Sequence, residues 1–106
     1  MSGTISISGS GGRTAATTTA GDPVDIVLGD DAVRQRVDVA VDTSGAATLT
    51  VSVSDTGDYN GEEFDVQTID YTEAITQLEQ FDFAYSHVRV SVDSNLNNLE
   101  ATARGA

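Results

Sequence analysis

The fold is decided by residues 36–54, which read RVDVAVDTSGAATLTVSVS. Valine or leucine occupies every second position on both sides of a Thr-Ser-Gly-Ala turn, and most of the positions between are polar. This alternation has the period of a β-strand with one buried and one solvated face. The stretch therefore predicts two antiparallel strands, from Val33 to Asp42 and from Ala47 to Ser54, joined as a β-hairpin.

Shorter alternating runs lie on both sides of this stretch. Residues 69–80 fit either a helical turn or a strand, and the strand-like chain around them favours a strand. About seven or eight short strands, separated by turn residues, predict an all-β antiparallel sandwich of the jelly-roll kind. The other runs centre on Ile5, Val24–Leu28, Phe64–Val66, Phe81–Tyr85, Val88–Val92 and Leu99–Ala103.

The length of 106 residues is that of a single domain. Residues 1–21 hold five glycines and only two large aliphatic side chains after Met1, so we expect a flexible N-terminal arm at 1–21 and a β-sandwich domain at 22–106. Ile5 and Ile7 either form the first strand of their own sandwich or pair with an edge on another subunit. No stretch approaches the roughly 20 apolar residues of a membrane span, and we expect neither membrane insertion nor a secretory signal.

The charge is strongly one-sided. Seventeen acidic residues, twelve of them aspartate, face five arginines, with no lysine or cysteine and a net charge of −12. Self-repulsion at this charge opposes the compact state, and molar salt, with a Debye length of about 3 Å, screens it. Such a composition is typical of proteins from salt-loving archaea and their viruses. It also argues against nucleic acid as a partner, because that needs a basic face.

One loop offers oxygen ligands at close spacing. Asp55, Asp58, Asn60 and Glu62 all lie within nine residues and would supply several of the six or so oxygens that Ca²⁺ or Mg²⁺ requires. The order of an EF-hand loop is absent. The alternative is a solvated connecting loop without a metal.

Catalytic motifs are not found. His87 is the only histidine, and no serine lies in a Gly-x-Ser-x-Gly sequence, so we expect a non-enzymatic protein. Arg36 and Arg89 lie within predicted strands, where they either balance neighbouring aspartates or contact a partner protein.

The order of elements in residues 33–106 resembles the small β-sandwich modules in structural proteins of tailed viruses. Matching features are the Ser44-Gly45 turn, an aromatic strand with Tyr85 that runs into Val88-Arg89-Val90, and a terminal strand from Leu99 to Arg104-Gly105. A tryptophan often found after the Ser-Asp loop of those modules is absent here, with Phe64 nearest to its place.

The composition and the resemblance lead to one main expectation. The chain is expected to be a virion structural protein of a halophilic archaeal tailed virus, a capsid decoration or minor capsid protein that forms homo-oligomers and contacts other virion proteins, such as the major capsid protein. A neck or tail component is the first alternative. A carbohydrate- or surface-binding module is the second, and it would use the tyrosines at 59, 71 and 85.

Overall fold

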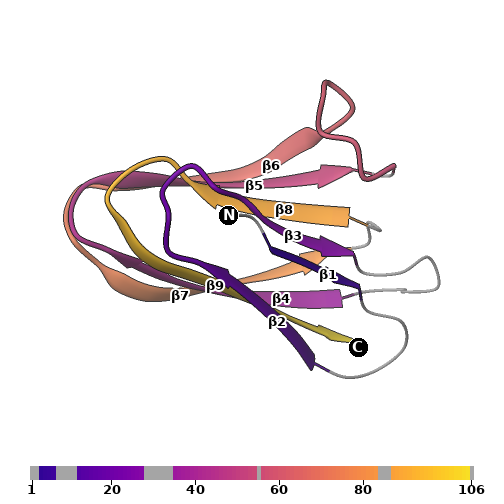
Figure 1. Cartoon of the computed structure of the whole chain (residues 1–106), viewed down its shortest axis with the longest axis horizontal. Coiled ribbons are helices and arrows are strands. Elements are labelled where there is room, and N and C mark those ends of the chain that lie inside the picture. Colours follow the sequence, from indigo (N-terminus) through magenta and orange to yellow (C-terminus); the bar gives the residue numbers. More distant parts are fainter. Residues whose placement is uncertain (1–2, 7–11, 28–34, 55, 84–86, 106) are drawn as a thin grey trace.

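The computed structural model describes residues 3–6, 12–27, 35–54, 56–83 and 87–105, which form nine β-strands in two packed sheets (Figure 1). The expected all-β sandwich is confirmed. None of the described residues is helical, so this part of the chain holds no helix that could cross a membrane. The strands are β1 (Gly3–Ser6), β2 (Gly12–Thr17), β3 (Val24–Val27), β4 (Gln35–Thr43), β5 (Ala47–Ser54), β6 (Phe64–Tyr71), β7 (Thr76–Phe83), β8 (His87–Val92) and β9 (Leu96–Gly105).

The strands pair like one long hairpin that has been folded over. β2 pairs with β9, β3 with β8, β4 with β7 and β5 with β6, all antiparallel. The resulting sheets have the orders β1-β3-β8-β5-β6 and β2-β9-β4-β7. This nested pairing is the topology of a jelly roll, as expected, and β1 is added to it as an edge strand parallel to β3.

The predicted hairpin between β4 and β5 is wrong, because the two strands lie in different sheets. Residues 44–46 carry the chain across, and the loop between β8 and β9 holds them. The backbone N–H of Ser44 donates to the carbonyl of Asn95 at 2.8 Å, and the Asn95 side-chain amide donates to the carbonyl of Ala46 at 2.6 Å. Asn95 adopts a φ of 55°, a left-handed conformation in which asparagine is enriched.

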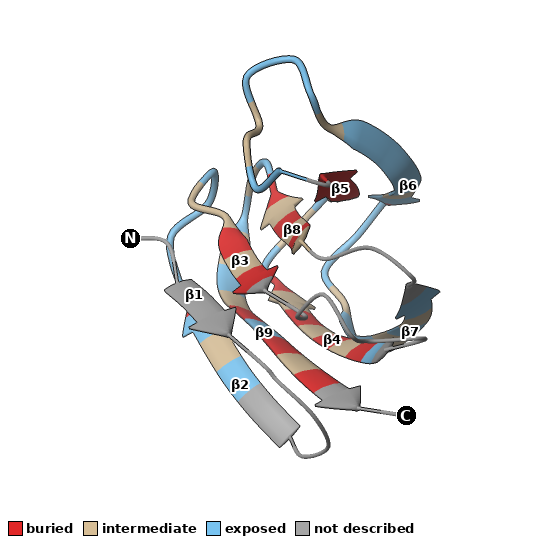
Figure 2. Cartoon of the chain, turned by 90° about the vertical axis from the view of Figure 1, so that its right-hand side faces the viewer, coloured by how far each residue is buried: buried red, intermediate tan, exposed pale blue. Residues whose placement is uncertain are grey.

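The core lies between the facing sheets, where every second residue of the central strands is buried (Figure 2). Full burial of such an aliphatic side chain contributes about 1.5 to 3 kcal/mol. The valines and leucines of residues 36–54 all face this core. The largest fully buried side chains are Val24, Ile26, Val37, Val39, Val41, Leu49, Val51, Val53, Val88, Val90 and Leu99.

Two strands of the sandwich come from the segment expected to be an arm. β1 lies beside β3, with Ile5 opposite Ile26 in the backbone register, and β2 lies beside β9 at the edge of the other sheet. Ile7 is outside the described residues. The division into an arm and a domain stays a prediction, which truncation tests below.

The ambiguous stretch at residues 69–80 forms parts of β6 and β7 rather than a helix. These are the edge strands of the two sheets on the same side of the sandwich, and most of their residues are exposed (Figure 2). The buried core therefore lies around β3, β8, β4 and β9, whereas most side chains of β6 and β7 are exposed to solvent.

Candidate functional site

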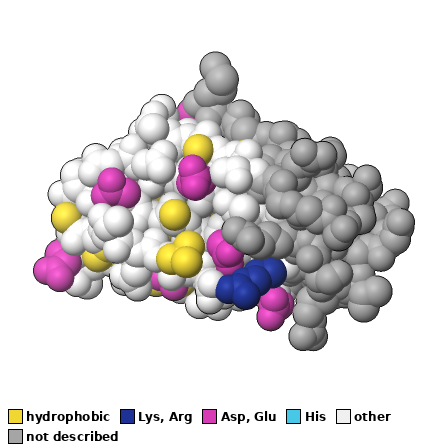
Figure 3. Space-filling view, turned by 90° about the horizontal axis from the view of Figure 1, so that it is seen from below, with side chains coloured by type: hydrophobic (Ala, Val, Ile, Leu, Met, Phe, Trp, Pro, Cys, Tyr) yellow, Lys and Arg dark blue, Asp and Glu magenta, His cyan; other side chains and the backbone are white. Residues whose placement is uncertain are grey.

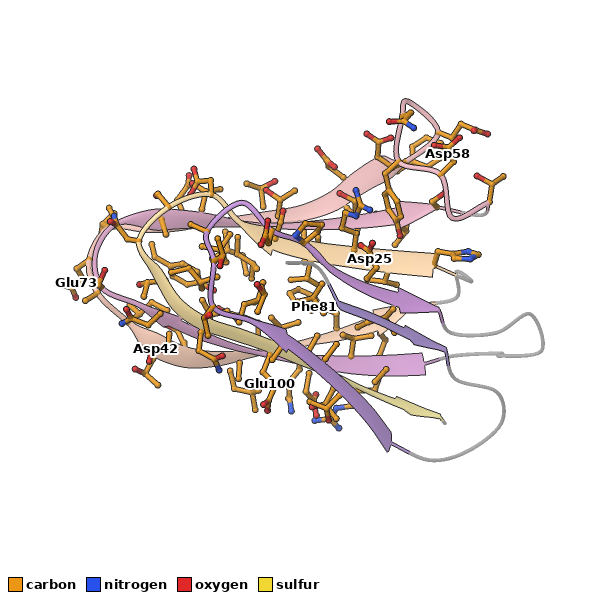
Figure 4. The ribbon with its side chains drawn as sticks, in the orientation of Figure 1. Asp25, Asp42, Asp58, Glu73, Phe81 and Glu100 are labelled. Carbon is orange, nitrogen blue, oxygen red and sulfur yellow. The ribbon has the colours of Figure 1, made fainter. Side chains whose placement is uncertain are left out.

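A polar cluster around Arg89 lies on the outer face of the five-stranded sheet. Arg89 of β8 donates from Nε to Asp25 Oδ1 at 2.5 Å and from Nη2 to Asp25 Oδ2 at 2.8 Å. Its guanidinium also covers the ring of Tyr59, 4.0 Å from the ring centroid. The hydrogen bond with Asp25 raises the pKa of Arg89 above its ordinary value. Asp25 and the loop that carries Asp58 lie on this side of the molecule (Figure 4).

Tyr59 is half-buried, and its hydroxyl is fully buried without a hydrogen-bond partner. Burial, followed by the negative charge of Asp25, raises the pKa of Tyr59 to about 12. This cluster pins the loop after β5 to the sheet. Arg89 was predicted either to balance neighbouring aspartates or to contact a partner protein. In the structure its side chain contacts Asp25 and Tyr59 of its own chain.

The buried Ser54 hydroxyl organises the start of that loop. It accepts the backbone N–H of Gly57 at 3.1 Å and donates to the carbonyl of Asp58 at 2.9 Å. Gly57 has a φ of +80°, and a Cβ there would lie 2.9 Å from two atoms of the His87 ring. His87 is thus packed against the loop backbone, on the side of the sheet that holds Arg89.

The four predicted metal ligands are only partly described. Asp55 lies outside the described residues. A side-chain hydrogen bond with Asp58, and then the negative charge of Asp58, raise the pKa of Glu62, while the Asn60 backbone N–H donates to Asp58 Oδ1 at 3.0 Å. No group of three or more histidines, cysteines or carboxylates that could hold a metal occurs among the described residues. Binding of Ca²⁺ or Mg²⁺ stays an untested prediction.

Arg36, the other predicted partner contact, lies on the four-stranded sheet. Its Nε donates to Asp38 Oδ1 at 3.0 Å, and half of its side chain is exposed. Arg36 and Arg89 therefore lie on different sheets and do not form one site.

An exposed apolar edge on β6 was missed by sequence reasoning. Phe64 is 64% exposed and Val66 44% exposed, although their alternation suits a buried strand face. The two carboxylates of β6 are bound back onto β5: Asp65 accepts from Ser52 Oγ at 2.6 Å, and Asp70 accepts from Thr48 Oγ1 at 2.9 Å. The residues between them, 66–69, are uncharged.

The two tyrosines that the structure describes, Tyr59 and Tyr71, are each engaged with another side chain of the chain. Arg89 covers the ring of Tyr59. Tyr71 is 7% exposed and donates its hydroxyl to Glu79 Oε2 at 2.8 Å. Burial, followed by this hydrogen bond, raises the pKa of Tyr71 above its ordinary value. Tyr85 is outside the described residues.

Comparison with known proteins yields no family. No family model and no curated protein matches the sequence. Among solved structures, the Clostridium thermocellum xylanase 10B modules (CBM22-1 and GH10, in complex with xylohexaose) are similar at a TM-score of 0.48 and 16% identity. That match covers 73% of this chain, which spans 17% of the xylanase chain. PliG of Aeromonas hydrophila, a periplasmic inhibitor of g-type lysozyme, has a TM-score of 0.48 and 14% identity, with 98% and 96% of the two chains covered. Neither similarity carries an argument about function.

Proposed function

We propose that this chain is a non-enzymatic structural protein that assembles in many copies at high salt, as a capsid decoration or minor capsid protein of a tailed virus of a salt-loving archaeon. The observation that carries the proposal is the exposed apolar edge of β6, with Phe64 and Val66 on the surface of a chain of net charge −12. Sheet edges of this kind are templates for pairing with another chain.

Salt controls this assembly in the proposal. Copies that each carry −12 repel one another at low ionic strength, and this repulsion is largely removed when the Debye length falls to about 3 Å. The hydrogen-bonding groups of the β6 backbone and the apolar surface of Phe64 do not depend on charge. The central residues 66–69 add no charge to the edge.

The test is the oligomeric state as a function of salt, measured by sedimentation. We expect the wild-type chain to associate in molar sodium chloride and to dissociate at low salt. The double variant Phe64→Ser/Val66→Ser should stay monomeric at both. Leu78→Ser is the matched control, because Leu78 is 55% exposed on the other sheet; it should associate like the wild type. A wild-type chain that is monomeric in molar salt contradicts the proposal.

The viral context has its own test. Genes that neighbour the gene of this chain should encode a major capsid protein and other virion proteins, and neighbours without any virion protein would contradict the assignment. A neck or tail component is the alternative within the same class. It is distinguished by copy number in the virion, because a decoration protein covers the capsid whereas a neck protein forms a single ring.

A further inference from the structure

A hollow of about 450 Å³ opens on the outer face of the four-stranded sheet, near the turn between β6 and β7. Small-molecule sites have volumes of roughly 300 to 1,000 Å³. Figure 3 shows this face, where hydrophobic side chains lie between acidic ones. The side chains that the register turns to the outer face here come from three adjacent strands: Ala40 and Asp42 of β4, Thr76 and Leu78 of β7, and Asn98 of β9.

The register arranges these residues in two rows. Asp42 lies between Thr76 on one neighbouring strand and Asn98 on the other, which makes a polar row across the sheet. Two residues along β4, Ala40 lies between Leu78 on β7 and Glu100 on β9, so Ala40 and Leu78 form a short apolar row beside the polar one, with the exposed Glu100 at its β9 end. Asp42 lies on the outer side of this sheet (Figure 4), where one of its carboxylate oxygens accepts the Thr76 hydroxyl at 3.2 Å.

The polar row offers both kinds of hydrogen-bonding group. The Asp42 carboxylate only accepts, while the Asn98 amide and the Thr76 hydroxyl each donate and accept. A ligand hydroxyl also donates and accepts, so it can bind to any of the three. The apolar row suits the C–H face of a ring: the methyl group of Ala40 leaves the floor flat, and Leu78, 55% exposed, forms a wall beside it.

The same residues disfavour other ligands. None of the lining residues is basic and one is a carboxylate, so a phosphate or carboxylate ligand would meet only negative charge. A divalent cation needs several oxygen ligands of its own, and Asp42 is the sole carboxylate in the lining.

We propose that this hollow binds a neutral carbohydrate, with a sugar ring laid on Ala40 against Leu78 and its hydroxyls bonded to Asp42, Thr76 and Asn98. This site is separate from the β6 edge, since it lies on the other sheet. It would give a structural protein a second role, attachment to a glycan-coated surface.

The experiment is an NMR titration of the isotopically labelled full chain in molar salt. The probes are the methyl glycosides of glucose, galactose, mannose and N-acetylglucosamine, each raised to about 50 mM because a shallow site with few polar groups binds in the millimolar range. At least one sugar should shift the amide signals of Asp42, Thr76, Leu78 and Asn98 in a saturable way.

Variants define the site. Ala40→Leu should abolish binding by filling the floor. Asp42→Asn should weaken binding about five-fold, because a hydrogen bond to a charged carboxylate is replaced by a weaker one to a neutral amide. Asp70→Asn is the matched control, because Asp70 also accepts a threonine hydroxyl, at 2.9 Å, on the other sheet; it should bind like the wild type. Thermal melting shows that each variant is folded.

Three outcomes would overturn the proposal. The first is that no sugar of the panel shifts any signal, and the second is that the shifts map to residues outside the hollow. The third is that sodium sulfate or calcium chloride at low background salt shifts the hollow residues while the sugars do not. None of these results bears on salt-dependent assembly, which sedimentation measures separately.

Discussion

Arg89 and Asp25 lie directly opposite one another in the register of β8 and β3, and two parallel hydrogen bonds join their side chains. The pair is mostly shielded from solvent, with 33% of the arginine side chain and 20% of the aspartate side chain exposed. Stacking of the same guanidinium on Tyr59 extends the contact from two strands to the loop after β5. One arginine thus joins three segments that are far apart in the sequence.

Replacing Arg89 with lysine should lower the free energy of unfolding by about 1 to 2 kcal/mol, although the charge is kept. Lysine can neither form the two-pronged contact with Asp25 nor stack flat on Tyr59. Urea unfolding measures the change. The control is Arg36→Lys, which alters an exposed arginine bonded to Asp38 and should change stability by less than about 0.5 kcal/mol. Equal losses of stability in the two variants would contradict a stabilising role for the Arg89 contacts.

Tyr59→Phe should leave stability unchanged or raise it, because the hydroxyl it removes is buried without a partner. Tyr71→Phe is the opposite case. It removes a 2.8 Å hydrogen bond to Glu79 and should cost about 1 to 2 kcal/mol. The two variants delete the same atom type, so a comparison of their melting temperatures isolates the hydrogen bond. A large loss in Tyr59→Phe would show that its hydroxyl has a partner in solution.

Stability should fall as the pH rises from 10.0 to about 12. The folded-state pKa of Tyr59 is raised from 10.0 to about 12, so the unfolded chain releases this proton first and binds fewer protons over that interval. The contribution of neutral Tyr59 to the free energy of unfolding is complete below pH 10.0, and it is lost as the pH rises through the folded-state pKa. Urea unfolding across the interval should show a shallower fall for Tyr59→Phe than for the wild type, and identical slopes would contradict the shift.

Gly57→Ala should destabilise the fold more than Gly61→Ala. Both glycines have positive φ angles, +80° and +110°, but only at Gly57 would the new Cβ lie 2.9 Å from the His87 ring. Backbone strain should cost about 1 kcal/mol in each variant, and the clash should add to it at Gly57. His87→Ala in the Gly57→Ala background should remove the clash and so recover the additional loss of stability seen at Gly57. Thermal melting of the four proteins gives the comparison.

Deleting residues 1–11 removes β1 and leaves β2 in place. Since β1 pairs with β3 along four residues of its own chain, we expect the monomer to melt several degrees lower at high salt, about 1 kcal/mol for a domain of this size. An unchanged melting temperature with lost association would instead show that the segment with Ile5 and Ile7 acts as an arm between subunits.

The fold class could be predicted because burial enforces a period of two along each central strand. The valines of residues 36–54 were correctly expected to face a core. The partner of each strand could not be predicted in the same way. The side chains of β4 and β5 alternate identically whether the strands share a sheet or face each other across the core, and the contacts that decide this come from Asn95, half the chain away.

The candidate sites were less predictable for a related reason. Phe64 and Val66 have the pattern of core residues, but they lie at the start of an edge strand, where its register with β5 shifts between Val51 and Ser52, and both are exposed. The hollow needs Asp42, Thr76 and Asn98 in one row, and that row follows from pairings between three strands. No local pattern in the sequence predicts this row of three residues. The pairing of Arg89 could be predicted in part, since an arginine inside an apolar strand needs a carboxylate nearby.

The nested pairing also has a consequence for biosynthesis. β9 lies between β2 and β4 in the four-stranded sheet, so that sheet has a gap at its centre until β9 has left the ribosome. The pair that can form first is β5 with β6, whose strands are adjacent in sequence, and each later pair encloses the one before it. Strand pairs of such wide separation form slowly and leave edges exposed meanwhile. The facing edges of β2 and β4 therefore stay unpaired until the last strand arrives.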